Sequence, residues 1–171
     1  MDTTVKRAAL GAAIFTLLVP CTVAGVAPYF LIISRSQLFA FDSSPVRASG
    51  AALFMLGLPI YAWCVYDFVF AGRGTPSPTH PPSALVVRGL YRYSRNPMYV
   101  GVCAVLFGEA LYFGSGNQLV YALCALAGFH LRVVLGEERT LRRTFGAAYE
   151  DYCARVPRWI GRVKKGGRDG D

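Results

Sequence analysis

The chain has 171 residues, of which 54% are hydrophobic and 16% are charged, and its formal net charge is +8. Soluble domains usually carry about 25% charged residues, so this composition excludes an ordinary soluble domain. Ten of the eighteen Lys and Arg residues follow the last apolar run, a distribution typical of membrane proteins and not of nucleic-acid binding. We therefore expect an all-α, polytopic integral membrane protein whose surroundings are membrane lipids, with no nucleic-acid partner.

The apolar residues fall into runs long enough for helices that span a bilayer, which need about 20 residues each. The first run has no charge from Ala8 to Ile33, and the second has none from Ala48 to Tyr66. Between Asn96 and Leu131 the only charged residue is Glu109. These runs predict about four spans, near residues 8–33, 48–71, 97–113 and 118–135.

The segments between the spans predict how the spans are connected. A proline- and glycine-rich stretch, residues 71–83, predicts an exposed loop or a lid. Gly114–Asn117, with the sequence GSGN, predicts a tight turn, so the last two spans would form a helical hairpin. Its tip carries no charge and both of its open ends are rich in arginine, which places the tip outside and both chain termini in the cytoplasm. Five small residues of this hairpin favour close helix packing: Gly101, Gly108, Ala122, Ala125 and Gly128.

After the last span, Glu137–Cys153 has the apolar spacing of a cytoplasmic amphipathic helix. Residues 161–171 form a basic tail that we expect to be disordered, and residues 1–160 would be a single membrane domain. The five cysteines include no CxxC and no histidine at ligand spacing, so we expect neither a metal site nor disulfide bonds.

Three segments carry a family resemblance: GRGTPSP, then RGLYRYSRNPMYVG from Arg88, then GEERTLRRTFGAAYEDYCARVPRWI from Gly136. In this order and spacing the chain resembles the isoprenylcysteine carboxyl methyltransferases, their bacterial members in particular, and is similar to the phospholipid N-methyltransferases. The resemblance covers roughly residues 45–160. It implies S-adenosylmethionine as the methyl donor, bound on the cytoplasmic side, and a lipid-like or isoprenoid acceptor that enters from the membrane. For a bacterial protein this membrane would be the inner membrane.

The resemblance also implies site residues at the matching positions. The donor site would use these residues: Tyr91, Arg95, Asn96, Pro97, Tyr99, Gly101, Glu137 and Glu138. Arg95, Glu138 and Arg158 would serve catalysis, with arginine aligning a carboxylate acceptor through two hydrogen bonds. This chain has Asn96 where the family most often has histidine, which puts any histidine hydrogen bond to the donor in doubt.

Most of these residues also have a purely structural interpretation. The two glutamates suit a helix start, and Arg95 suits an anchor at the membrane surface. Asn96 and Pro97 suit the cap and first position of the third span. Glu109, about 18 Å along a helix from Pro97, would form a structural hydrogen bond across the hairpin. A lone histidine such as His130 is more often a satisfied core residue than a site residue.

The leading function is methyl transfer from S-adenosylmethionine to an amphipathic acceptor, as carboxyl O-methylation or amine N-methylation. A carboxylate needs a cationic group to orient it, whereas an amine must lose a proton, for which Glu137 or Glu138 would be the base. The sequence supplies both residue types and therefore leaves this choice, the acceptor and the oligomeric state open. Two other classes are a membrane reductase that uses NADPH, because sterol reductases have a similar Arg-x-Pro-x-Tyr segment, and a non-catalytic membrane scaffold.

Overall fold

The computed structural model describes residues 10, 18–34, 36–70 and 85–161. All named elements of these residues are helices, in agreement with the all-α prediction. Their bounds are η1 Thr22–Val26, α2 Ala27–Ile33, α3 Ser44–Phe70, η2 Gly89–Arg92, α4 Pro97–Phe113, α5 Gly116–Arg132, η3 Val133–Glu137, α6 Glu138–Phe145 and α7 Ala147–Arg155. The first half of the first predicted span, the proline-rich loop and the basic tail after Gly161 lie outside the described residues.

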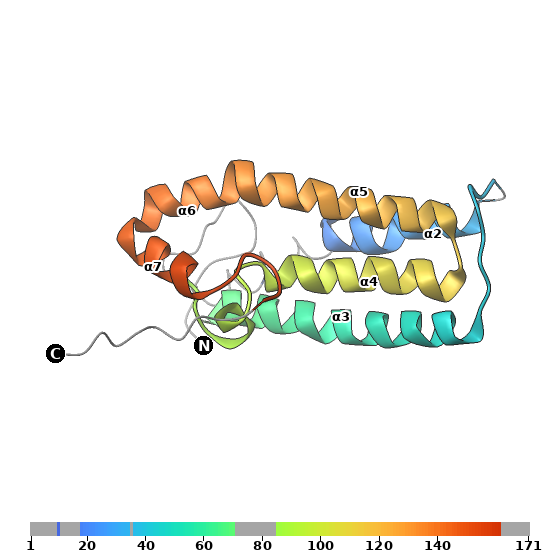
Figure 1. Ribbon diagram of the computed structural model, residues 1–171, viewed down its shortest axis with the longest axis horizontal. Coiled ribbons are helices and arrows are strands. Elements are labelled where there is room, and N and C mark those ends of the chain that lie inside the picture. The colour runs from blue at the N-terminus through green and yellow to red at the C-terminus, as the bar shows by residue number, and fades with distance from the viewer. Residues whose placement is uncertain (1–9, 11–17, 35, 71–84, 162–171) are drawn as a thin grey trace.

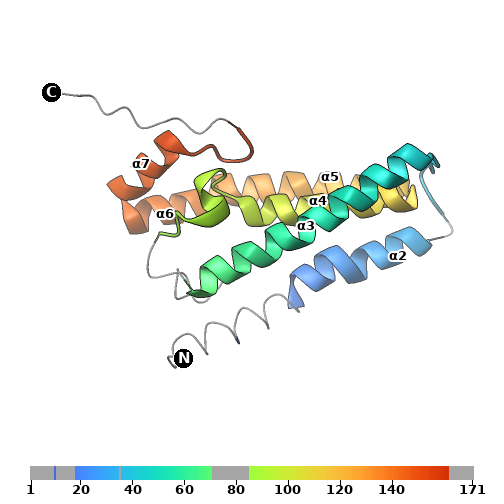
Figure 2. The same cartoon turned by 90° about the horizontal axis from the view of Figure 1, so that it is seen from below.

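Helices α3, α4 and α5 and the shorter α2 run side by side as an elongated bundle, and α6 continues α5 at one end (Figure 1). At this end α7 folds back alongside α6, and the chain then returns toward the start of α4 (Figures 1 and 2). The hairpin turn and the link between α2 and α3 lie at the opposite end. The bundle therefore has one end formed by short connections and another end that carries the basic carboxy-terminal helices.

The third predicted span coincides with α4, and the second differs from α3 by a few residues at its start. The predicted tight turn is present. α4 ends at Phe113 and is capped by Gly114, whose φ of 64° is left-handed. The Ser115 side chain caps α5 by accepting a hydrogen bond from the Gln118 N–H. Two helices are long and apolar enough to cross a membrane, at Ser44–Phe68 and Gly116–Phe145, with mean hydropathies of 1.6 and 1.8. Thr22–Ile33 and Pro97–Phe113 are shorter apolar helices.

Close packing of α3 against α4 depends on glycines seven residues apart on each helix. A Cβ atom on Gly101 would lie 2.9 Å from the Tyr61 backbone nitrogen, and one on Gly108 would lie 2.6 Å from the Phe54 nitrogen. On α3, Gly50 and Gly57 meet the α4 backbone in the same way. These glycines let the two backbones approach closely, as predicted for Gly101 and Gly108.

Two sequence predictions about packing and helix extent are wrong. A Cβ atom on Gly128 would meet nothing within 4 Å, so this glycine does not mediate a close helix contact among the described residues. The predicted amphipathic helix Glu137–Cys153 is instead two helices, because the chain breaks at Gly146, where φ is 52°. An L-side chain rarely adopts that backbone conformation, whereas glycine adopts it readily.

Candidate functional site

The segment around Arg95 is held against the carboxy-terminal end of the chain by hydrogen bonds. The Arg95 backbone N–H donates to the Pro157 carbonyl at 2.9 Å, and the Asn96 amide Nδ2 donates to the Arg158 carbonyl at 3.0 Å. Asn96 occupies the N-cap position of α4 and Pro97 the first helical position, as the structural interpretation predicts. The Asn96 side chain makes no capping bond, however, and positions the Arg158 segment instead.

Tyr99, Arg132 and Glu137 form a first group, the Tyr99 cluster, contributed by α4, α5 and η3. The Tyr99 hydroxyl donates to Glu137 Oε1 at 2.6 Å, and Arg132 Nε donates to the same oxygen at 2.8 Å and to the Tyr99 hydroxyl at 3.1 Å. The Tyr99 ring packs on Phe129 with 4.7 Å between ring centroids. Tyr99 and Glu137, both predicted as donor-site residues, therefore lie in contact at one end of the bundle.

Glu138 is the centre of a second group, the Glu138 cluster, with Arg95, Arg142 and Arg158. Its side chain is only 4% exposed and its Oε1 accepts hydrogen bonds from Arg95 Nη1 at 3.1 Å and Arg158 Nε at 2.6 Å. Arg158 Nη2 also donates to Oε2 at 3.1 Å, and Arg142 Nη2 lies 3.8 Å from that oxygen. The three guanidinium groups keep the Glu138 carboxylate ionised, and they leave a net positive charge although Arg142 also pairs with Glu150 at 2.8 Å.

Arg95 retains an unused donor inside this cluster. Its Nη1 also donates to Cys153 Sγ at 2.8 Å, whereas its buried Nε has no hydrogen-bond partner among the described residues. A buried N–H group without a partner is costly, so such a group is suited to a ligand acceptor. Tyr149, on α7, lies beside Arg95 and Cys153, and burial raises the pKa of its hydroxyl to about 12. The Tyr149 hydroxyl therefore stays protonated near neutral pH.

The π-helical turn η3 brings Arg132 and Glu137 to the same side of their helix. Residues five apart in an α-helix are about 140° apart around the axis, because each residue turns the helix by about 100°. In a π-helix the hydrogen bonds join residues five apart, as the Glu138 N–H and Val133 carbonyl are joined here. Arg132 and Glu137 are thereby aligned. Glu138, the next residue, points instead toward Arg95 and Arg158.

The structure brings together six of the predicted site residues and leaves others elsewhere. Those at the two clusters are Arg95, Asn96, Tyr99, Glu137, Glu138 and Arg158. Tyr91 lies in a separate buried group with Cys64 and Phe68, its carbonyl accepts a hydrogen bond from the Tyr152 hydroxyl, and burial raises its pKa well above the ordinary value. Gly101 faces α3, and Pro97 starts α4.

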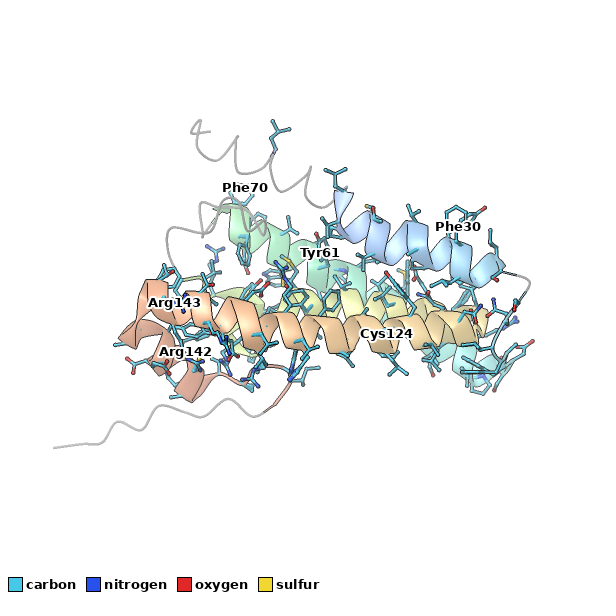
Figure 3. All side chains as sticks on the ribbon, turned by 90° about the horizontal axis from the view of Figure 1, so that it is seen from above. Phe30, Tyr61, Phe70, Cys124, Arg142 and Arg143 are labelled. Atoms are coloured by element: carbon cyan, nitrogen blue, oxygen red, sulfur yellow. The ribbon has the colours of Figure 1, made fainter. Side chains whose placement is uncertain are left out.

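Sequence reasoning missed Arg132 and Arg142, which belong to these clusters. Arg132 is the last basic residue before the glutamates, but its five-residue spacing from Glu137 does not match an α-helical face. Figure 3 shows Arg142 on α6 at the same end of the bundle as Phe70, the last residue of α3, and far from Phe30 on α2. An arginine one helical turn from Glu138 was the signal available in the sequence.

Two further polar residues of the hairpin have the following partners. Gln118 Nε2 donates to Glu109 Oε2 at 3.0 Å, which confirms the predicted structural hydrogen bond across the hairpin. His130 is exposed and therefore not a core residue. Its Nδ1 accepts a hydrogen bond from Trp159 Nε1 at 3.2 Å, and the two rings stack.

Comparison with known proteins identifies the family. The family model described as phospholipid methyltransferase matches residues 45–148, more than half of the chain. The protein-S-isoprenylcysteine O-methyltransferase of Schizosaccharomyces pombe is 35% identical over 77 residues, which are 44% of this chain and 32% of the relative. The chain thus covers about a third of this curated relative, and no solved structure matches. Together with the apolar helices, these matches show that the chain belongs to the phospholipid methyltransferase family, as a member similar to the isoprenylcysteine methyltransferases.

Proposed function

We propose that this protein is a multi-pass membrane methyltransferase that transfers a methyl group from S-adenosylmethionine to a lipid-like acceptor. The observation that carries the proposal is that the Tyr99 cluster and the Glu138 cluster lie at the same end of the bundle, linked by the consecutive residues Glu137 and Glu138. The two clusters contain two carboxylates, an aromatic hydroxyl and several guanidinium groups, contributed by the segment before α4, by α4, α5, η3 and α6, and by the segment after α7. We infer four spans, with this end of the bundle in the cytoplasm because the basic residues lie there.

The chemistry of the side chains fits S-adenosylmethionine, which has an ammonium, a carboxylate, ribose hydroxyls and an adenine. Glu137 Oε2 accepts no hydrogen bond from the described residues and would receive the ammonium group, because Oε1 is already held by Tyr99 and Arg132. The buried Arg95 Nε would donate to the carboxylate. When bound, the donor supplies an electrophilic methyl group.

The residues of this chain contribute mainly by positioning and by excluding water. Methyl transfer from a sulfonium is an in-line displacement, so alignment and desolvation of the nucleophile carry most of the rate. Glu138 does not act as a base in this scheme, because its two oxygens accept three hydrogen bonds from arginines. Its role is to fix Arg95 and Arg158.

The excess of arginine favours a carboxylate acceptor, and therefore carboxyl O-methylation. With three guanidinium groups against two carboxylates, Glu138 and the Glu150 that pairs with Arg142, the Glu138 cluster keeps a net positive charge that complements an anion and repels an ammonium group. An amine acceptor would instead need a free base, and Glu137 is the carboxylate with an unused oxygen in these clusters. We therefore propose O-methylation of a lipid-like or isoprenoid acid, with Arg95 and Arg158 orienting the acceptor.

Binding of S-adenosylhomocysteine, the demethylated product of the donor, tests this proposal. Isothermal titration of the full chain in nanodiscs should show saturable binding of S-adenosylhomocysteine that Glu137→Gln weakens at least tenfold. Glu150→Gln, at an exposed side chain of α7, is the matched control and should leave the affinity within twofold. Binding of NADPH without binding of S-adenosylhomocysteine would overturn the proposal in favour of a reductase, and binding of neither molecule would favour a scaffold.

A further inference from the structure

An open apolar groove lies beside the Glu138 cluster, between α5 and the segment that follows α7. It has a volume of about 540 Å³ and is lined by Leu123, Leu126, Ala127, His130, Leu131 and Trp159. The five α5 residues lie on one side of that helix and extend over about 12 Å, from Leu123 to Leu131. Trp159 is the wall contributed by the other element, so the groove is more than the bare surface of one helix.

This wall is fixed in place by the same contacts that build the candidate site. The Trp159 Nε1–H donates to His130 Nδ1 at 3.2 Å and the rings stack with 6.1 Å between centroids. Trp159 directly follows Arg158, whose carbonyl accepts the Asn96 hydrogen bond and whose guanidinium binds Glu138. The end of the groove near Trp159 is therefore one residue away from an arginine of the Glu138 cluster.

The charge next to this end indicates what kind of molecule the groove accepts. An apolar chain gains little by moving from lipid to an apolar protein surface, so shape and the polar end of the ligand must provide selectivity. The Glu138 cluster provides a positive polar end, since Arg95, Arg142 and Arg158 outnumber the two carboxylates that they contact, Glu138 and Glu150. A neutral or cationic amphiphile has no negatively charged head group that could pair with these arginines.

We propose that the groove binds the apolar chain of a single-chain acceptor with an anionic head group, the charged end lying toward Arg158. This inference rests on the proposed function, which it extends by naming where the acceptor chain lies and which acceptor class fits. It assigns to Trp159 and Ala127 a role in acceptor binding, and to Asn96 the role of positioning Trp159 through the Arg158 carbonyl.

Quenching of Trp159 fluorescence by a brominated chain tests the groove directly. The full chain carrying Trp63→Phe, so that Trp159 is its only tryptophan, is placed in phosphatidylcholine nanodiscs and titrated with 12-bromododecanoic acid. We expect saturable quenching, and several-fold weaker binding of the neutral 12-bromododecan-1-ol. Ala127→Phe, which fills the groove, should raise the half-saturating mole fraction at least tenfold, and Ala127→Leu about threefold.

Ala52→Phe is the matched control, because Ala52 is likewise exposed but lies on α3 outside the groove. It should change half-saturation less than twofold. Quenching that rises in proportion to the probe without saturating, or that Ala52→Phe alters as much as Ala127→Phe, would overturn the proposal and mean that the groove meets annular lipid only.

Binding of S-adenosylhomocysteine, measured on the same samples, separates this inference from the proposed function. The wild type and both Ala127 variants should bind it within twofold of one another, which also shows that the variants are folded. Saturable quenching without S-adenosylhomocysteine binding would refute the methyltransferase but retain an anionic-lipid site. The reverse result would refute the groove alone.

Discussion

Replacing Glu138 with glutamine should destabilise the protein strongly, although the change removes only one charge. The Glu138 side chain is 4% exposed, and its ion-pair partners Arg95 and Arg158 are 11% and 35% exposed. Removing one member of a buried ion pair costs about 3–5 kcal/mol, because its partner is left buried and unpaired. Arg158 reaches water and would recover part of this cost, so we expect a loss of about 2–3 kcal/mol, which arises mainly at Arg95.

The assay is reversible unfolding by sodium dodecyl sulfate from mixed micelles, followed by tryptophan fluorescence and far-UV circular dichroism. Glu150→Gln is the control, because Glu150 accepts a hydrogen bond from Arg142 at 2.8 Å but is 57% exposed, and an exposed pair contributes little. We expect no measurable change for it. In a double-mutant cycle, Arg95→Met combined with Glu138→Gln should cost less than the sum of the single changes. A Glu138→Gln unfolding free energy equal to that of Glu150→Gln would refute the reasoning.

Three further predictions follow from described contacts. Gly108→Ala should destabilise the bundle by about 1–3 kcal/mol, since its Cβ would lie 2.6 Å from the Phe54 nitrogen, whereas Gly128→Ala, with nothing within 4 Å, should be neutral or stabilising in the same unfolding assay. Tyr99→Phe should weaken S-adenosylhomocysteine binding about fivefold in calorimetry, because the 2.6 Å bond that orients Glu137 is lost; an unchanged affinity would remove Tyr99 from the site. Burial raises the pKa of Tyr149 to about 12, so its stabilising contribution is complete below about pH 10 and is lost as the pH rises toward 12; thermal melts of Tyr149→Phe should show a smaller decline over this window than the wild type.

Several features of this structure were predictable from the sequence because they depend on local chemistry. The bounds of α4 follow from Pro97 at its start and from the glycine-rich turn at its end. The hydrogen bond between Glu109 and Gln118 follows from the cost of an unpaired acid in an apolar hairpin. The meeting of Tyr99 and Glu137 follows from the hairpin itself, which returns the chain to the same end of the bundle.

Other features depend on contacts that no local pattern reveals. Arg132 joins Glu137 only because a π-turn changes the helical register, and the apolar residues of that turn do not signal it. Asp67, 1% exposed, pairs with Arg88 at 3.0 Å across the proline-rich stretch, so the pair depends on how α3 meets η2. Asn96 has the residue type of a helix cap, yet its amide is engaged by a carbonyl 62 positions away.

The π-turn between α5 and α6 has a consequence for how this sequence tolerates change. Its inner residues serve as a spacer, so their number sets the direction in which each glutamate points, while their side chains contribute comparatively little. Exchanging Val134 or Leu135 for another apolar residue keeps that direction, whereas deleting either one would swing both carboxylates away from their arginines at once. Over these few positions, chain length is under tighter constraint than residue identity.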